Sequence, residues 1–155
     1  MKLYDRVVFV GRSGSCREPM AAGILQDLLL KEEIEVLARG LVVSFPEPMN
    51  QKAEAVLISN GISMPGFVSV ELAQEDVAGN TLVLTMDSLQ KEKVLSHFSK
   101  VTDVYTLNEF VGDELEIVDP YGGALPAYGL CYEMLRKSIK KLVKILSEGE
   151  DKWQK

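Results

Sequence analysis

The sequence predicts an α/β fold, a three-layer sandwich in which helices cover both faces of a central four-stranded parallel sheet. Four short apolar runs indicate strands, and segments with helical periodicity alternate with them along the chain. Helices of ten or more residues between strands indicate right-handed βαβ units, which build a parallel sheet. Such sheets bind ligands beyond the carboxyl ends of their strands, so the loop at residues 11–17 and the loop around Asp119 are the candidate sites.

The first strand is predicted at residues 7–10, where Val-Val-Phe-Val is ended by Gly11. Glu18 and Pro19 favour the first turn of a helix. Apolar residues then recur at helical spacing as far as Lys31: Met20, Ile24, Leu25, Leu28 and Leu29. The chain therefore begins with a strand, a short loop and a helix.

The later sequence continues this alternation. Residues 34–38 are predicted as a strand, and a helix at residues 50–60 follows a proline-rich loop and is stopped by Gly61. A strand, a polar helix, a further strand and a long final helix are then predicted at residues 81–86, 88–98, 101–107 and 127–147.

Length and composition indicate one domain, at residues 1–148, followed by a frayed charged tail at residues 149–155. With 46% apolar and 26% charged residues, the composition excludes disordered, collagen-like and disulfide-scaffold chains. The early apolar run is too short for a secretory signal or a membrane span. The sequence therefore predicts a cytoplasmic protein.

Charge and cysteine usage restrict the partners. The net charge of −6 disfavours nucleic acid and anionic membranes, although a local basic site can still hold phosphate. Cys16, Cys131 and the single histidine, His97, are too few for a disulfide framework or a zinc site. The prediction is a monomer or weak dimer with no metal or other cofactor and no nucleic-acid or membrane partner.

The loop after the first strand has the composition of an anion-binding site, and it runs Gly11, Arg12, Ser13, Gly14, Ser15, Cys16 and Arg17. Small residues let successive backbone N–H groups turn inward, and the helix N-terminus adds partial positive charge. Arg17 can offer a planar fork to two phosphate oxygens, and Arg12 a second cation. The alternative is an ordinary strand-to-helix loop with a solvated arginine.

With its surroundings, this loop resembles that of the low-molecular-weight protein tyrosine phosphatases, in which C-x-x-x-x-x-R is followed by S-P-M-A. Here the matching stretch ends in Cys16-Arg17-Glu18-Pro19-Met20-Ala21, and Ala38-Arg39-Gly40 and Asp119-Pro120-Tyr121-Gly122-Gly123 match further downstream. The resemblance covers residues 5–147. It implies a flavodoxin-like, phosphotyrosine phosphatase I-like fold and, as partner, phosphate or a phosphorylated small molecule or protein.

The sequence departs from the family at position 11, where the family has the cysteine thiolate that attacks phosphorus and this chain has Gly11. Glu18 stands where the family has a serine that supports the thiolate. Glu18 is also simply a favourable charge near a helix N-terminus.

The other site positions match by resemblance. Arg17 corresponds to the phosphate-binding arginine, Asp119 to the general acid and Tyr121 to an aromatic wall. Gly14 replaces a loop asparagine, and glycine adopts positive φ equally well. Without the family, Asp119 is interpreted as a turn residue and Tyr121 as a packing residue.

Other side chains could replace the missing thiolate. Cys16 lies beside an arginine near a helix N-terminus, which predicts a lowered pKa and a reactive thiol, whereas its register favours a small buried packing residue. Cys131 lies on the apolar stripe of the last helix and is predicted to be core. Ser13 and Ser15 need an adjacent base, and His97 is expected to face solvent.

Three functions are consistent with these residues. The favoured one is a degenerate phosphatase that binds phosphate or a phosphorylated ligand with little or no phosphotyrosine hydrolysis. The second is an active phosphomonoester hydrolase that uses an unorthodox nucleophile or an activated water. The third is a non-catalytic interaction module. An arsenate reductase on this scaffold needs the loop nucleophile and further redox cysteines, which the sequence lacks.

Overall fold

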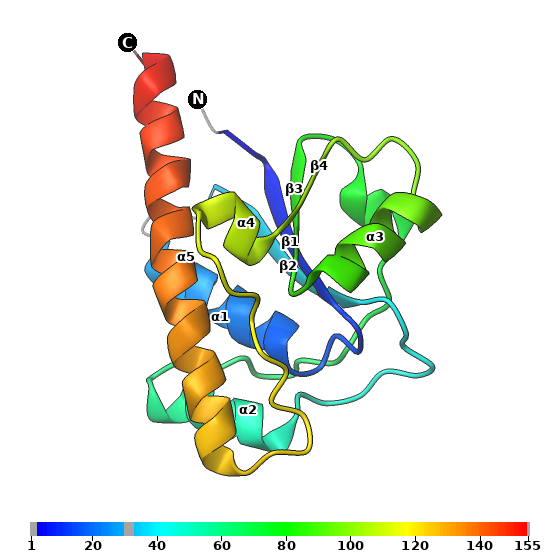
Figure 1. The fold of residues 1–155 in the computed structure, drawn as a ribbon, viewed down its shortest axis with the longest axis vertical. Coiled ribbons are helices and arrows are strands. Elements are labelled where there is room, and N and C mark those ends of the chain that lie inside the picture. The colour runs from blue at the N-terminus through cyan, green and yellow to red at the C-terminus, as the bar shows by residue number, and fades with distance from the viewer. Residues whose placement is uncertain (1–2, 30–32, 155) are drawn as a thin grey trace.

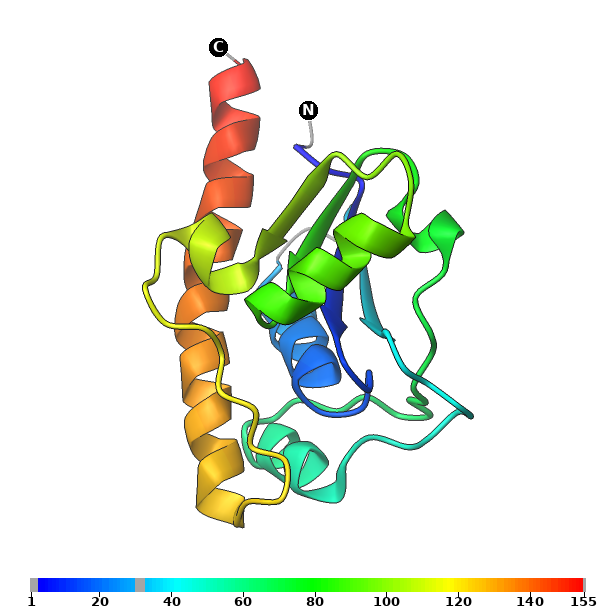
Figure 2. The ribbon, with the colours of Figure 1, turned by 45° about the vertical axis from the view of Figure 1, so that its right-hand side comes forward.

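The computed structural model describes residues 3–29 and 33–154, and this part of the chain contains a four-stranded parallel sheet in the order β2-β1-β3-β4. Its strands are β1 (Arg6–Gly11), β2 (Glu35–Gly40), β3 (Thr81–Thr85) and β4 (Asp103–Thr106). Helices lie on both faces of the sheet, as the two views in Figures 1 and 2 show. The predicted α/β fold is confirmed. The first and last residues of each predicted strand lie within two residues of the observed limits.

The helices are α1 (Arg17–Leu28), α2 (Gln51–Ser59), α3 (Ser88–His97), α4 (Leu107–Val111) and α5 (Leu125–Gln154), with a 3₁₀ turn, η1 (Gln74–Val77). The predicted limits of α2 are close because Asn50 caps its N-terminus, where its side chain accepts hydrogen bonds from two backbone N–H groups. The first helix ends at Leu28, and its predicted limit, Lys31, lies outside the described residues.

Two predicted element limits differ from the structure. The segment predicted as a strand to Leu107 turns into α4, because Thr106 and Glu109 form a capping box, each side chain accepting from the other's backbone N–H. The last helix, predicted at residues 127–147, begins at Leu125 and its helical backbone continues through Gln154, past Gly149. One glycine costs a helix only about 1 kcal/mol relative to alanine, so it does not stop α5.

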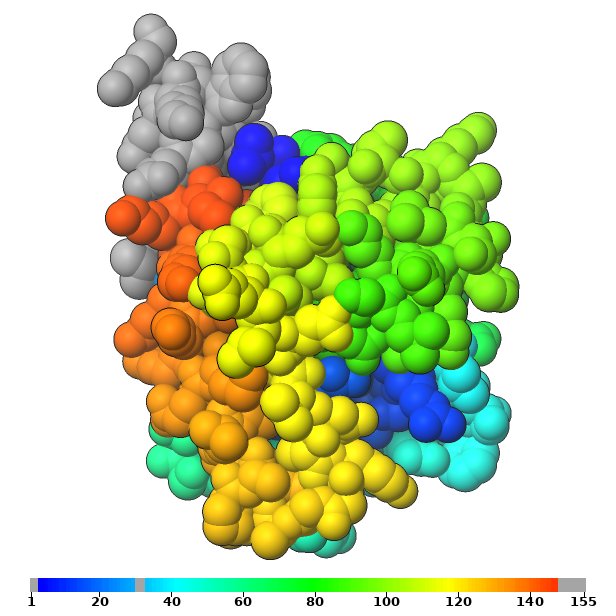
Figure 3. Space-filling view, viewed as in Figure 1, coloured from blue at the N-terminus to red at the C-terminus, as the bar shows by residue number. Residues whose placement is uncertain are grey.

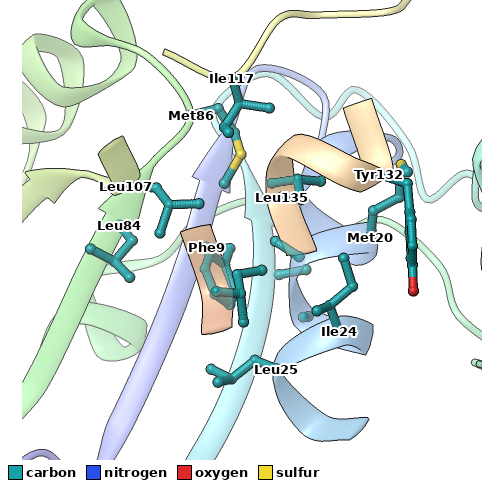
Figure 4. Close-up of a cluster of buried hydrophobic side chains, with 14 of the residues drawn as sticks. Phe9, Met20, Ile24, Leu25, Leu84, Met86, Leu107, Ile117, Tyr132 and Leu135 are labelled. Atoms are coloured by element: carbon teal, nitrogen blue, oxygen red, sulfur yellow. The ribbon is translucent and has the colours of Figure 1, made fainter. Parts of the chain in front are cut away.

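The core has two parts because successive side chains of the central strand point to opposite faces of the sheet. Val7 and Phe9 pack under α1 and α5, in the larger cluster that Figure 4 shows. Val8 and Val10 pack on the opposite face with Val94 of α3. All four strand residues are fully buried, which fixes β1 in the middle of the sheet and places its last residue at the carboxyl edge. In the described part of the chain, no helix has the length and apolar character that a membrane span requires.

Candidate active site

The loop after β1 is held against the end of β2. The backbone N–H groups of Leu41 and Val42 donate to the carbonyls of Gly11 and Arg12, at 3.0 and 2.8 Å. Gly14 has φ +76°, which confirms the predicted positive φ, and a Cβ there would lie 2.8 Å from the backbone nitrogen of Gly40. Both the backbone angle and the close approach therefore require glycine at position 14.

A pocket of about 330 Å³ opens beside this loop. In the space-filling view, the blue surface of the loop lies between the yellow segment that contains Asp119 and the cyan segment that follows β2 (Figure 3). The pocket is lined by Arg12, Ser13, Ser15, Cys16, Arg17, Glu18, Glu47, Asp119 and Tyr121. All the site residues proposed from the sequence thus line one pocket, except Gly11 and Gly14, which contribute backbone to the same loop.

Arg17 is fixed from two sides. Its side chain is 5% exposed, and Nη1 donates to the carbonyl of Ile117 at 2.9 Å. Nη2 lies 3.5 Å from Oδ2 of Asp87 and 3.9 Å from Oδ2 of Asp119. Asp87 also caps α3 by accepting from the N–H of Gln90. The guanidinium group therefore joins α1 to the N-terminus of α3 and to the segment before α5.

Glu18 fills the space that a side chain at position 11 would need. A Cβ built on Gly11 would lie 1.8 Å from Oε1 of Glu18 and 2.5 Å from Cδ. Glu18 is 2% exposed, and its Oε2 is buried with no hydrogen-bond partner among the described residues. Burial raises the pKa of Glu18 to about 7, against the opposing effects of Arg17 and of the backbone N–H groups of Glu18 and Cys16. The loop thus already encloses one carboxyl group.

This raised pKa predicts how stability depends on pH. Because the folded-state pKa lies above the unfolded value, folding favours the protonated acid, and stability is lost as the pH rises through about 7. The variant Glu18→Gln cannot ionise. We expect the difference in unfolding free energy, variant minus parent, to be about 2–3 kcal/mol more positive at about pH 8 than at about pH 5. Urea denaturation at both pH values measures this difference, and an equal gap at the two pH values would contradict it.

The cysteines behave as packing residues. Burial, together with the carboxyl group of Glu18, raises the pKa of Cys16 to about 12, so the predicted lowering of its pKa is wrong. Cys16 is 6% exposed, which agrees with the alternative interpretation of a small buried packing residue, whereas the direction in which Glu18 points was not visible in the sequence. Cys131 is 2% exposed within the larger core cluster, as predicted, and burial raises its pKa to about 12 as well.

The remaining candidates differ in their surroundings. Oδ1 of Asp119 accepts from the backbone N–H of Tyr121 at 3.1 Å, which agrees with the turn interpretation, while Oδ2 faces Arg17. Tyr121 is 79% exposed, so it does not pack as a buried residue. The hydroxyl groups of Ser13 and Ser15 lie 3.1 Å apart. His97 is exposed, as expected, and lines a different cavity.

Two contributions were not recognised from the sequence. Glu47 reaches the pocket from the β2–α2 connection, and Asp87 orients Arg17 from the start of α3. The only signal for Asp87 was its place as a polar residue after a buried strand, at the sheet edge where ligands bind. Among the side chains that the structure describes, those of residues 3–29 and 33–147, no group of three or more His, Cys, Asp or Glu could hold a metal ion.

The parallel sheet, its order and the helices on both faces define a doubly wound α/β protein, with a pocket at the carboxyl edge of the central strand. Residues 6–152 match the family described as low molecular weight phosphotyrosine protein phosphatase, and the chain belongs to that family.

Individual relatives support this assignment. The chain is 30% identical over 137 residues to the low molecular weight protein-tyrosine-phosphatase PtpB of Staphylococcus haemolyticus. The match covers 88% of this chain and 96% of the relative. The solved YwlE arginine phosphatase from Geobacillus stearothermophilus is 29% identical with a TM-score of 0.89, and the match covers 96% of both chains. A cysteine-to-serine variant of YwlE with a phosphorylated active-site serine is 28% identical with a TM-score of 0.85, covering 92% of this chain and 95% of that one.

Proposed function

We propose that this chain binds phosphate or a phosphorylated ligand in the pocket beside residues 11–17 and hydrolyses phosphate esters slowly or not at all. The observation that carries the proposal is the pair Gly11 and Glu18: position 11 has no side chain, and the carboxyl group of Glu18 fills its space. In the YwlE variant described above, an active-site serine in place of cysteine carries phosphate. By the family resemblance the matching residue here is Gly11, which cannot accept a phosphoryl group. Loss of a catalytic nucleophile typically costs orders of magnitude in rate.

Several features support retained binding of an oxyanion. Arg12 and Arg17 both line the pocket, together with the hydroxyl-bearing Ser13 and Ser15. The backbone N–H groups of Cys16 and Glu18 lower the pKa of the Glu18 carboxyl group by stabilising its ionised form. A carboxylate is itself an oxyanion, so this part of the loop already stabilises negative charge on oxygen. A tetrahedral oxyanion would meet these donors next to a buried guanidinium group, which binds such groups through two parallel hydrogen bonds.

The relatives suggest two classes of phosphorylated ligand. PtpB is named a tyrosine phosphatase, and YwlE is named an arginine phosphatase. Tyr121 offers an exposed ring to an aromatic ligand, whereas the carboxyl groups of Glu47 and Asp119 offer partners to a guanidinium group. Phosphotyrosine and phosphoarginine are therefore the probes to compare with inorganic phosphate.

Inorganic phosphate is expected to raise the melting temperature of the parent protein. A ligand bound only to the folded state adds about 2.7 kcal/mol at a hundred times its Kd. Arg12 is exposed, so Arg12→Ala should fold normally and bind phosphate at least about tenfold more weakly, since one charge-assisted contact is worth about 1.5–3 kcal/mol. Lys140→Ala, an exposed change on α5 with the same loss of charge, should bind like the parent. Absence of any shift in the parent would favour the interaction module.

A second candidate is hydrolysis with Glu18 as the nucleophile, which its position inside the loop favours. Its carboxylate would attack phosphorus to give an acyl phosphate, Asp119 would protonate the leaving oxygen, and water would release phosphate. Turnover of an aryl phosphate by highly purified protein, lost in both Glu18→Gln and Asp119→Asn, would support this candidate. No turnover in the parent supports the proposed binding function.

A further inference from the structure

Glu18 lies inside the loop rather than on the surface of α1. Its Oε1, Cδ and Cγ all come within 3 Å of the point where a Cβ on Gly11 would be, at 1.8, 2.5 and 2.9 Å. Glu18 nevertheless lines the pocket, together with Arg12 and Arg17. Glu18 therefore borders the pocket while its carboxyl group fills the space beside Gly11.

This carboxyl group has an unused polar atom. Oε2 is inaccessible to water and has no hydrogen-bond partner among the described residues. An ionised carboxylate only accepts hydrogen bonds, so in that state Oε2 is left without a donor and Glu18 repels an anion in the pocket. A protonated carboxyl group has an O–H to donate. A small rotation of the side chain toward the pocket that it lines lets a bound oxyanion supply the acceptor that the protonated form needs.

The charges around Glu18 come from several elements. Arg17 follows the loop at the start of α1, and Asp87 at the start of α3 pairs with it. Asp119 approaches from the segment before α5, and Cys16 and Cys131 are the two buried thiols nearby.

Arg12 and Glu47 complete the lining of the pocket from the loop itself and from the β2–α2 connection. The lining of the pocket therefore contains two guanidinium groups, those of Arg12 and Arg17, and three carboxyl groups, those of Glu18, Glu47 and Asp119. A doubly charged anion enters such a pocket more easily when one of the three carboxyl groups is neutral.

We propose that Glu18 is a ligand-contacting residue of this pocket, and that its carboxyl group donates a hydrogen bond to a bound tetrahedral oxyanion only when it carries a proton. The proposal rests on the proposed binding function. It adds that the protonation state of Glu18 decides whether the pocket binds an oxyanion. Oxyanion binding is then coupled to the uptake of one proton whenever Glu18 is ionised in the free protein. Affinity falls about tenfold for each pH unit above the titration of Glu18.

Sulfate is the suitable probe because it remains a dianion throughout the relevant pH range, whereas phosphate itself titrates there. Sulfate binding to the whole chain is measured by calorimetry at several values between about pH 5.5 and about pH 8.5. We expect the Kd of the parent to rise at least tenfold across this range, with proton uptake visible as a dependence on buffer ionisation enthalpy. Glu18→Gln keeps the shape of the side chain and offers an N–H donor at every pH, so its Kd should stay constant within about twofold.

His97→Gln is the matched control, since it also replaces an ionisable side chain by glutamine and His97 lines another cavity. It should keep the pH dependence of the parent. A parent Kd that is constant with pH, or a Glu18→Gln variant with the same slope as the parent, would overturn the role of Glu18 and leave the proposed binding function standing. Absence of sulfate binding by both proteins at every pH would overturn both.

Discussion

The double variant Gly11→Cys, Glu18→Ser is expected to hydrolyse an aryl phosphate at least a hundredfold faster than the parent, because it supplies a thiol at the position that the sequence resemblance matches to the family's nucleophile. The single variant Gly11→Cys should not gain this activity. Its Cβ would lie 1.8 Å from Oε1 of Glu18, so either the loop or the glutamate must move. Overpacking of this kind typically costs about 1–3 kcal/mol.

Initial rates with an aryl phosphate and melting temperatures for the parent, both single variants and the double variant measure this coupling. Glu18→Ser alone should fold and remain inactive, since it opens the space without supplying a nucleophile. Adding Asp119→Asn to the double variant should reduce its rate by about 10²-fold or more if Asp119 acts as the general acid. A folded but inactive double variant would show that the loop no longer has a catalytic geometry. Equal activity in the single and double cysteine variants would show that Glu18 does not occupy the critical space.

The fold was predictable because its signals are local. Residues 7–10 form a four-residue run of β-branched and aromatic side chains ended by a glycine, which is typical of a strand buried on both faces. Asn50 and Gly61 marked the ends of α2 through their capping and turn chemistry. The short helix α4 was missed because its capping box, Thr106 to Glu109, follows directly on a strand with no intervening loop.

The residues that line the pocket were largely predictable from the sequence, but the shift in the pKa of Cys16 was not. The loop residues, Asp119 and Tyr121 were proposed from resemblance, and they do line one pocket. The sequence placed Cys16 beside a cation and so suggested a thiolate. The opposite shift in pKa depends on burial and on the direction in which Glu18 points. Both are properties of the folded chain, since a helix N-terminus permits a glutamate to face either solvent or the loop.

The residues at positions 11 and 18 share one space. The absence of a side chain at Gly11 makes the space, and the side chain of Glu18 fills it. The sequence presents them as two separate differences from the pattern that it resembles. In the structure they are coupled, because a Cβ at position 11 would displace the carboxyl group of Glu18, and a smaller residue at position 18 would leave a cavity beside the loop.

Arg17→Met is expected to lower the unfolding free energy by about 3–5 kcal/mol at about pH 8, the usual cost of removing one partner from a buried group of charges. The substitution leaves the carbonyl of Ile117 without its donor, and it removes the cation that faces Asp87 and stabilises the ionised form of Glu18. The loss should be smaller at about pH 5, because Glu18 is then protonated and does not need a cation.

The pair Arg17 and Glu18 can be separated by a double-mutant cycle in urea. If the cost of Arg17→Met comes mainly from an uncompensated carboxylate, the double variant Arg17→Met, Glu18→Gln should recover at least about 1 kcal/mol at about pH 8 and little at about pH 5. If the cost comes from the hydrogen bond to Ile117 and the contact with Asp87, the second substitution should recover nothing at either pH. Recovery confined to the higher pH is the result we expect, since Glu18 is the buried carboxyl group beside Arg17 and has a pKa between these values. Equal recovery at both would contradict an ionised Glu18 in the folded protein.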